Sequence, residues 1–368
     1  MSDDQDRTPV ETNETISPET RRGLQRRGLL TGAVAGGAAT MLASLATQAR
    51  AAADAFPDHP RWKFVFINHV TTNPFFVPTQ YGIADACKLL GCGYQWTGSE
   101  TSDAGQMVNS LNAAIASKAD GIACCLVDPK AFNEPTERAL QAGIPVFAYN
   151  ADVPLGSPNK RLAYIGQDLY KAGYQMGLRI ADEVGSGHVA LFIATPGQLN
   201  IQPRFDGAKD AIAKSGKPIT VEEVASGPTL NEEISKVQAY YLGHQDIKGM
   251  YAVDGGTTMG VTQAMKQYGL VAKGIHGGGF DLLPKTLENI SEGFGDFTID
   301  QQPYLQGFYT VMEMFLFKAS GGLVGPADIN TGLKFVTKET VGPYLATKTR
   351  YEGNSGAPQI VPSHGAIG

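Results

Sequence analysis

Residues 120–150, DGIACCLVDPKAFNEPTERALQAGIPVFAYN, contain the pattern that decides the fold. An apolar run of strand length opens the stretch, a segment of helical length follows, and a second apolar run, IPVFAYN, closes it. Near-continuous apolar strands joined by a helical crossover are typical of parallel sheets that are covered on both faces. Residues 248–281, KGMYAVDGGTTMGVTQAMKQYGLVAKGIHGGGFD, repeat the same strand, helix, strand layout. These two stretches predict an α/β protein with two similar halves.

The same alternation extends over most of the chain. The ten candidate strands are KFVFINHV (63–70), GYQWTG (93–98), DGIACCLV (120–127), IPVFAYN (144–150), RLAYIG (161–166), HVALFIAT (188–195), ITVEEVA (219–225), GMYAVD (249–254), GIHGGGFD (274–281) and FTID (297–300). Amphipathic segments of helical period lie between them, and in residues 105–118 Met107, Leu111, Ala114 and Ile115 share one helix face. Ten such units are too many for one small sheet, and 368 residues are many for one compact core. We therefore expect two doubly wound parallel-sheet lobes.

The halves divide near residues 152–160, where VPLGSPNK supplies two prolines and a glycine. The predicted N-terminal lobe comprises residues 54–152 and 302–325, and the predicted C-terminal lobe comprises residues 153–301 and 326–345. The three hinge segments between the lobes are predicted near residues 151–154, 301–303 and 321–326. Two such lobes facing each other would bring the carboxyl ends of their strands to one shared cleft, where open α/β sheets bind ligands.

Residues 1–53 are typical of an export signal with a polar leader. The pair Arg26–Arg27 precedes an uncharged run, residues 28–46, and the small residues that follow, TQARAAADA, suit a signal peptidase. The arginine pair resembles a twin-arginine signal, so we expect a mature protein that starts within residues 52–55 and is periplasmic or extracellular. The alternative is a permanent transmembrane helix, for which the uncharged run has about the right length.

The bulk composition is that of an ordinary soluble globular protein, with 42% hydrophobic and 18% charged residues. The net charge of -6 argues against nucleic acid as a partner. Cys87, Cys92, Cys124 and Cys125 lie in predicted helix or strand interiors, so we expect buried thiols, with a Cys87–Cys92 bridge as the alternative. The histidines lack H-E-x-x-H spacing, and we expect no metal and no cofactor. The tail, residues 346–368, is rich in Gly, Pro and Ser and is expected to be irregular.

Hydrogen-bonding and aromatic side chains recur directly after the predicted strands. The candidate ligand-binding residues are Asn73, Phe75, Phe76, Asn150, Asp152, Asn200, Gln202, Arg204, Asp254, Asp281 and Gln301. Carboxylates and amides satisfy the hydroxyls of a sugar in pairs, and aromatic rings pack against its C–H faces. The set therefore favours a neutral polyhydroxylated ligand.

The stretch TTNPFF, residues 71–76, has two interpretations. Phe75 and Phe76 could form stacking planes for a ligand while Asn73 contributes an amide. Alternatively, both rings pack under the first helix and Asn73 merely caps it.

Several weak motifs in one order resemble a known family. NPFF after the first strand, DGI before the third, IPVFAYN, RFDG, GMYAVD, GGFD and QQP follow one another as in the ribose-binding type of ABC-importer sugar-binding protein, which has the type I periplasmic fold. The resemblance covers roughly residues 63–345. It implies that residues matching Asn73, Phe75, Phe76, Asn150, Gln202, Asp254, Asp281 and Gln301 line a sugar cleft. It also implies capture of a monosaccharide or sugar alcohol, without catalysis, and its delivery to an ABC permease; we expect a monomer.

Three positions depart from the ribose-binding pattern. Asn150 stands where the family often has aspartate, Asp254 where it often has asparagine, and Gln202 where it often has arginine, with Arg204 two residues further on. A bidentate arginine is the strongest polar clamp on a pair of hydroxyls. Its replacement argues against ribose and for another pentose, a hexose or an acyclic sugar alcohol.

Rival functions lack their own motifs. HGGGF, residues 276–280, resembles an esterase oxyanion hole, but the chain has no G-x-S-x-G. Asp254 and Asp281 could form a glycosidase pair, although amides surround both. A transcriptional repressor would need a helix-turn-helix where the export signal stands. A ligand receptor for chemotaxis or a sensor kinase shares the predicted biochemistry and differs only in its membrane partner.

Overall fold

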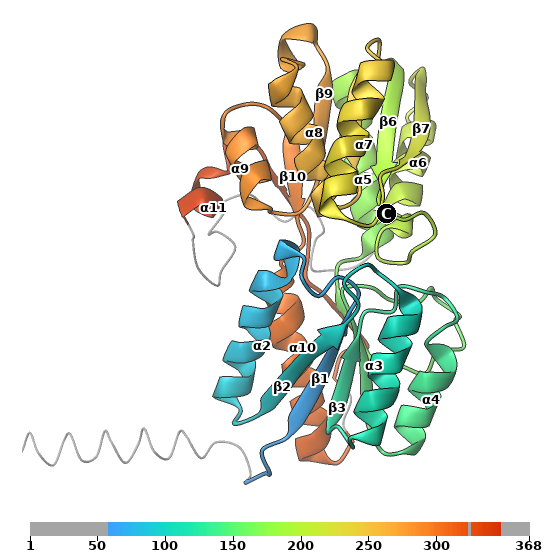
Figure 1. Ribbon diagram of the computed structural model, residues 1–368, viewed down its shortest axis with the longest axis vertical. Coiled ribbons are helices and arrows are strands. Elements are labelled where there is room, and N and C mark those ends of the chain that lie inside the picture. Colours follow the sequence, from blue (N-terminus) through green and yellow to red (C-terminus); the bar gives the residue numbers. More distant parts are fainter. Residues whose placement is uncertain (1–57, 323–324, 347–368) are drawn as a thin grey trace, which may run out of the picture. The chain divides into compact units, whose positions relative to one another are not determined.

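The computed structural model describes residues 58–322 and 325–346, and the chain from Arg61 onward forms one compact unit. This unit contains two six-stranded sheets, each with helices on both faces (Figure 1). The predicted α/β fold class with two doubly wound lobes is thereby confirmed.

The first lobe has the strand order β11-β5-β4-β3-β1-β2, and its neighbouring strands are all parallel. The strands are β1 (Lys63–Asn68), β2 (Gly93–Gly98), β3 (Gly121–Cys124), β4 (Val146–Tyr149), β5 (Tyr164–Gly166) and β11 (Asp328–Asn330). Its helices are η1 (Pro74–Phe76), α2 (Val77–Leu89), α3 (Ala104–Ala116), α4 (Asn133–Gln141) and α10 (Pro303–Ser320).

The second lobe has the order β12-β10-β9-β8-β6-β7, which repeats that of the first. Its strands are β6 (Gly187–Ile193), β7 (Ile219–Ala225), β8 (Gly249–Ala252), β9 (His276–Phe280), β10 (Phe297–Asp300) and β12 (Lys334–Val336). Its helices are α5 (Leu169–Val184), α6 (Gln202–Lys214), α7 (Leu230–Gly243), α8 (Gly255–Gln267), η2 (Val271–Lys273), α9 (Pro284–Ser291) and α11 (Gly342–Ala346). Only β12 is antiparallel to its neighbour, β10.

Two of the predicted lobe boundaries are wrong. β5 pairs with β4 in the first sheet, so the chain first crosses to the second lobe after Gly166 and not near residue 152. β11 also belongs to the first sheet, whereas β12 belongs to the second, so the last crossing lies at residues 331–333 and not at 321–326. The remaining crossing lies at Gln301–Gln302, between β10 and α10.

Glycines set the spacing of one helix pair in each lobe. A Cβ on Gly82 of α2 would lie 2.1 Å from the carbonyl oxygen of Tyr304 in α10, and a Cβ on Gly207 of α6 would lie 2.2 Å from that of Tyr170 in α5. Carbon and oxygen cannot approach so closely, so only glycine permits these helices to pack backbone against backbone. α10 begins directly after the crossing at Gln301–Gln302, so this close packing also fixes the first lobe's helix beside that crossing.

The remaining sequence expectations have mixed outcomes. Cys87, Cys92, Cys124 and Cys125 are buried free thiols, as expected, and the alternative Cys87–Cys92 bridge is absent. The export signal lies outside the described residues, as does the tail from residue 347.

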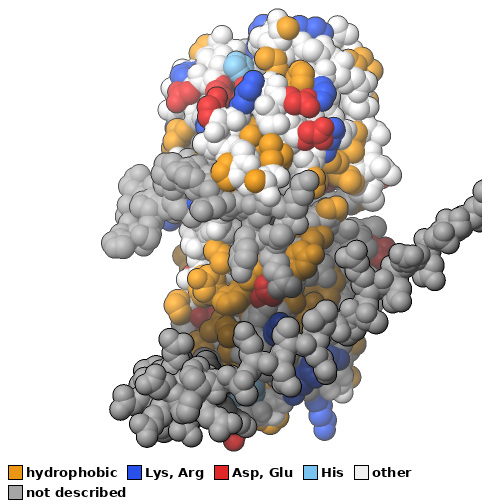
Figure 2. Space-filling model, turned by 90° about the vertical axis from the view of Figure 1, so that its left-hand side faces the viewer, with side chains coloured by type: hydrophobic (Ala, Val, Ile, Leu, Met, Phe, Trp, Pro, Cys, Tyr) orange, Lys and Arg blue, Asp and Glu red, His pale blue; other side chains and the backbone are white. Residues whose placement is uncertain are grey.

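Within residues 58–322 and 325–346, no helix is both long and apolar enough to cross a membrane. On the face drawn in Figure 2, acidic and basic side chains of the second lobe are interspersed rather than sorted by sign.

Candidate functional site

A cavity lies between the two lobes, at the carboxyl ends of their strands. It is lined by His69, Val70, Asn73, Phe75, Phe76, Ser102, Asn150, Ala194, Thr195, Gln198, Asn200, Ile201, Arg204, Pro228, Glu233, Asp254, Gly255, Gly256, Asp281 and Gln301. Nine of the eleven candidate residues belong to this set: Asn73, Phe75, Phe76, Asn150, Asn200, Arg204, Asp254, Asp281 and Gln301. The structure thus brings together side chains from distant parts of the sequence.

The NPFF segment both caps a helix and lines the cavity. The Asn73 side chain accepts a hydrogen bond from the Phe75 amide, 2.9 Å away, at the start of η1. Phe76 is 1% exposed and packs edge-on against Phe75 and His69, with ring centroids 4.7 and 5.4 Å apart. Phe75 remains partly exposed on the cavity wall. The two interpretations of this stretch are therefore compatible.

Asn150 and Asp281 occupy equivalent places in the two lobes, directly after β4 and β9. Both have a left-handed backbone, with φ of 62° and 77°. Asn and Asp tolerate this conformation better than other non-glycine residues. In this conformation both side chains line the cavity, where Asp281 accepts a hydrogen bond from Gln301 over 2.6 Å.

Arg204 is the buried cation of the cavity. Its side chain is 3% exposed, lies over the Phe280 ring at 4.1 Å, and donates to the Val253 carbonyl and the Gln167 side chain, each over 3.1 Å. Its Nε has no hydrogen-bond partner in the described part of the chain. Burial lowers the pKa of Arg204, and the nearby Asp281 carboxylate counteracts this shift. Two hydrogen bonds thus fix the guanidinium, and its Nε–H remains without a partner among the described residues.

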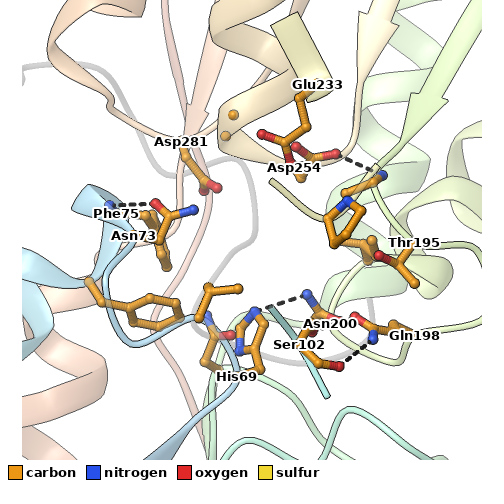
Figure 3. Close-up of a pocket in the computed structure, with 18 of the residues that line it drawn as sticks. His69, Asn73, Phe75, Ser102, Thr195, Gln198, Asn200, Glu233, Asp254 and Asp281 are labelled. Atoms are coloured by element: carbon orange, nitrogen blue, oxygen red, sulfur yellow. Dashed lines mark hydrogen bonds between the residues drawn. The ribbon is translucent and has the colours of Figure 1, made fainter. Parts of the chain in front are cut away.

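Three carboxyl groups of the second lobe, those of Glu233, Asp254 and Asp281, line the same cavity as Arg204. Burial raises the pKa of Asp281 to about 6 and raises that of Asp254 as well. Glu233 lies beside Asp254, and burial, followed by the Asp254 charge, raises its pKa far above the ordinary value. Figure 3 shows the side chains of Glu233, Asp254 and Asp281 on the second-lobe side of the space, opposite His69 and Ser102.

Direct contacts also cross between the lobes at the cavity. Asn200 Nδ2 donates to His69 Nε2 over 3.2 Å, and Ser102 exchanges two hydrogen bonds with the Gln198 side chain, of 2.7 and 3.0 Å. Because His69 Nε2 accepts, its proton lies on Nδ1, which has no partner among the described residues. Burial and the charge of Arg204 lower the pKa of His69 to about 3, so its imidazole is neutral.

Two predicted site residues lie outside the cavity. Asp152 is held by Arg161, whose Nε donates to it over 2.8 Å, on the loop between β4 and β5. Gln202 spans the first turn of α6, where it accepts from the Gly197 amide over 2.7 Å and donates to Asp206 over 2.9 Å. Arg204, and not Gln202, thus enters the cavity. Arg204 is one of the predicted site residues, so only the assignment of Gln202 to the cavity, and the argument against ribose that depended on it, is wrong.

Sequence reasoning missed five polar lining residues: His69, Ser102, Thr195, Gln198 and Glu233. His69 follows the first strand directly, so its position at a strand end was a usable indication. Glu233 belongs to the first turn of α7 and has no indication of this kind.

The glycines of HGGGF have a packing role. A Cβ on Gly278 would lie 2.5 Å from the Phe297 carbonyl, and one on Gly279 would lie 2.2 Å from Thr258 Oγ1. These glycines admit neighbouring backbone, as expected for a buried strand.

One histidine and carboxylate cluster is close enough to consider for a metal ion. It consists of Glu183, His276 and Asp296, whose ligand atoms lie within 4.8 Å of one another. Its carboxylates are already engaged, since Glu183 pairs with Arg179 and Asp296 accepts from the Gly277 amide. His276 starts β9, so the cluster is at the opposite end of the sheet from the cavity.

Comparison with known proteins agrees with this architecture. The sequence model of the family described as "Periplasmic binding protein domain" matches residues 64–318. The chain is 53% identical to the xylose/arabinose-binding protein XylF of Sulfolobus acidocaldarius over 313 residues, which cover 82% of this chain and 77% of that protein. It is 25% identical to the D-allose-binding periplasmic protein of Escherichia coli, over 74% of this chain and 90% of that protein.

Among solved structures, an ABC transporter solute-binding protein from Burkholderia graminis in complex with D-arabinose superimposes with a TM-score of 0.72. The two sequences are 27% identical, and the match covers 78% of this chain and 99% of that one. The fold of this chain is therefore shared with a protein whose structure was solved in complex with a pentose.

Proposed function

The chain belongs to the periplasmic binding protein family, and we propose that it captures a monosaccharide or sugar alcohol between its lobes and delivers it to an ABC permease. The proposal rests on the location of buried polar atoms that lack a hydrogen-bond partner. Among the described residues, buried side-chain atoms without a hydrogen-bond partner number eight, and four of them belong to cavity residues: His69 Nδ1, Asn200 Oδ1, Arg204 Nε and Glu233 Oε2.

An unsatisfied buried polar group costs roughly 1–3 kcal/mol, so such groups are rarely gathered without a purpose. Residues that line the cavity thus carry two N–H donors and two oxygen acceptors without a partner, while the Phe75 ring supplies an apolar surface. A sugar hydroxyl both donates and accepts, and the C–H faces of a sugar pack on an aromatic ring. A polyhydroxylated molecule satisfies all of these groups at once.

Hinge closure is the proposed mode of action. The lining residues come from both lobes, so a ligand that contacts both stabilises the closed form relative to the open one. We consider pentoses first among the candidate ligands. The support is that the relative with 53% identity is named a xylose/arabinose-binding protein. We further propose that the chain is exported through its arginine-pair signal and acts as a monomer without catalysis.

Thermal unfolding of the mature chain against single ligands tests this function. The panel contains D-xylose, D-arabinose, D-ribose, D-glucose, xylitol, amino acids and nucleosides at millimolar concentration. A ligand present at a thousandfold excess over its Kd stabilises the folded state by about 4 kcal/mol. We expect such a shift with one or a few sugars or alditols; a shift with amino acids or nucleosides alone would overturn the sugar assignment.

Arg204→Lys tests the site itself. Lysine keeps the charge but lacks the planar fork, so sugar affinity should fall by about tenfold to a hundredfold, equivalent to losing one hydrogen bond to a charged group. The matched control is Arg138→Lys on α4, where the arginine side chain is 47% exposed. Equal affinity of wild type and Arg204→Lys would contradict the placement of the ligand.

A further inference from the structure

Glu233 is a buried acid in the wall of the cavity, contributed by a helix rather than by a strand end. It is 6% exposed, and its Oε2 has no hydrogen-bond partner among the described residues. Gly256 faces it from the start of α8, and a Cβ there would lie 1.7 Å from Glu233 Oε2. The absence of a side chain at residue 256 is what leaves space for this carboxyl group.

The surroundings of Glu233 decide which carboxyl group carries a proton. Asp254 caps α8 and accepts from two backbone amides, Thr257 at 2.9 Å and Ala194 at 3.2 Å. Amide donors and a helix N-terminus stabilise a carboxylate, so Asp254 is the ionised member of the pair. Glu233 receives no comparable donor, and two adjacent buried carboxylates repel each other.

Charged groups around Glu233 reinforce this assignment. Glu232 on the same helix, Asp254 on α8 and Asp281 after β9 all act on it as like charges. Arg204 is the cation lining the same cavity, and two of its nitrogens already donate to Val253 and Gln167. His69, across the cavity, is neutral. The balance of these groups favours the proton on Glu233.

We propose that Glu233 contacts the ligand as a neutral carboxylic acid whose proton is shared with the Asp254 carboxylate, and that the cavity therefore accepts uncharged polyols and excludes sugar acids. The inference rests on the proposed function and names the ligand class of the same site. A sugar acid would bring a further negative charge to Asp254 and Asp281, with one arginine to meet it.

The proposal makes sugar affinity dependent on pH in one direction. Since the complex retains the Glu233 proton, affinity is constant above the range in which Asp281 titrates, near pH 6, and falls once the free protein begins to lose the Glu233 proton as pH rises. The slope approaches tenfold per pH unit. If the ligand bound the ionised acid instead, affinity would rise with pH.

The experiment is isothermal titration of the mature chain with whichever of D-xylose or D-arabinose binds, at pH values from about 7 to about 11. Glu233→Gln keeps an amide of similar shape that carries no titrating proton, so the alkaline loss of affinity should disappear in this variant. Glu223→Gln on β7, an exposed acid of the same lobe, is the matched control and should keep the wild-type slope. At neutral pH, D-galacturonate should bind at least tenfold more weakly than the neutral sugar.

Carbon-13 NMR of the glutamate carboxyl groups provides a direct readout, with Glu233 assigned by its loss in Glu233→Gln. The resonance should remain that of a protonated acid at neutral pH. An ionised Glu233, or an alkaline slope that persists in Glu233→Gln, would overturn this inference and leave the sugar assignment intact. Failure of every sugar to bind at any pH would instead overturn the proposed function, and this inference with it.

Discussion

Gly207→Ala tests the claim that backbone contact between α5 and α6 positions the cavity. The added Cβ would lie 2.2 Å from the Tyr170 carbonyl oxygen and 2.8 Å from the Tyr174 nitrogen, both backbone atoms of α5. Ordinary contact begins at 3.4 Å, so the two helices must separate locally by about 1.2 Å. Neither atom is on a side chain that could rotate away.

The expected cost follows from two opposing terms. Overpacking a rigid site costs about 3 kcal/mol at the upper end of its usual range, and alanine in place of glycine returns about 1 kcal/mol of helix propensity. The net loss of unfolding free energy is therefore about 2 kcal/mol, which lowers Tm by about 4–8 °C for a domain of this size. Arg204 lies one turn before Gly207 on α6, so sugar affinity should fall in the same variant.

Gly243→Ala is the matched control. Gly243 ends α7, and nothing lies within 4 Å of the position of its Cβ. This substitution should leave stability unchanged or raise it slightly, and it should leave sugar affinity unchanged. Chemical denaturation of the three proteins, followed by calorimetric titration with sugar, measures both quantities. A Gly207→Ala protein as stable as wild type would refute the reasoning, because the helices would then not be held in backbone contact.

Three further predictions concern the lobes, the buried acid and the thiols. Gln198→Ala removes two hydrogen bonds to Ser102 across the lobes, together worth about 1–3 kcal/mol. Small-angle scattering of the unliganded chain should therefore show a larger radius of gyration. An unchanged radius would show that these two bonds do not hold the lobes together. Burial raises the pKa of Asp281 from 3.8 to about 6, so the folded state binds this proton more tightly than the unfolded chain does. As pH rises from about 4 to about 6, the free energy of unfolding therefore loses the contribution of Asp281, about 3 kcal/mol. Denaturation of Asp281→Asn across that range should show a correspondingly smaller fall, and a fall equal to that of wild type would contradict the assignment. Burial raises the pKa of Cys87 to about 12 and that of Cys92 to about 11, so Ellman's reagent should label these thiols at pH 8 only after denaturant is added, and rapid labelling of the folded chain would show that they are accessible.

The sequence predicts the fold wherever apolar runs are long enough to identify a strand. All ten predicted strands are present, because buried parallel strands have few polar positions. The sheet to which β5 belongs was not predictable in the same way. The sequence of a three-residue strand such as Tyr164–Gly166 does not indicate which strand it pairs with, and the Pro-rich loop before it resembles a domain linker. β11 and β12 have three residues each and escaped notice for the same reason.

The cavity was predictable where a side chain follows a strand directly. Asn150, Asp254 and Asp281 stand at strand ends, and the topology alone places them at one edge of each sheet. Gln202 and Arg204 stand on a helix, where two residues rotate a side chain by more than half a turn. Only the helix start, at Gln202, decides which of them faces inward, and helix boundaries are the least certain part of a sequence pattern.

The hinge and the cavity share one hydrogen-bond network, which links ligand contact to lobe movement. At the first crossing, Gln167 accepts from Arg204 and donates to the Gly332 carbonyl at the third crossing, over 3.1 and 2.9 Å. Thr331 at the third crossing donates to the Gln301 carbonyl at the second, over 2.7 Å, and Gln301 holds Asp281. A ligand that engages Arg204 and Asp281 therefore contacts groups bonded to all three crossing segments. Any rotation of the lobes would rearrange the same bonds that orient the cavity side chains, so we expect ligand binding and lobe closure to be thermodynamically coupled.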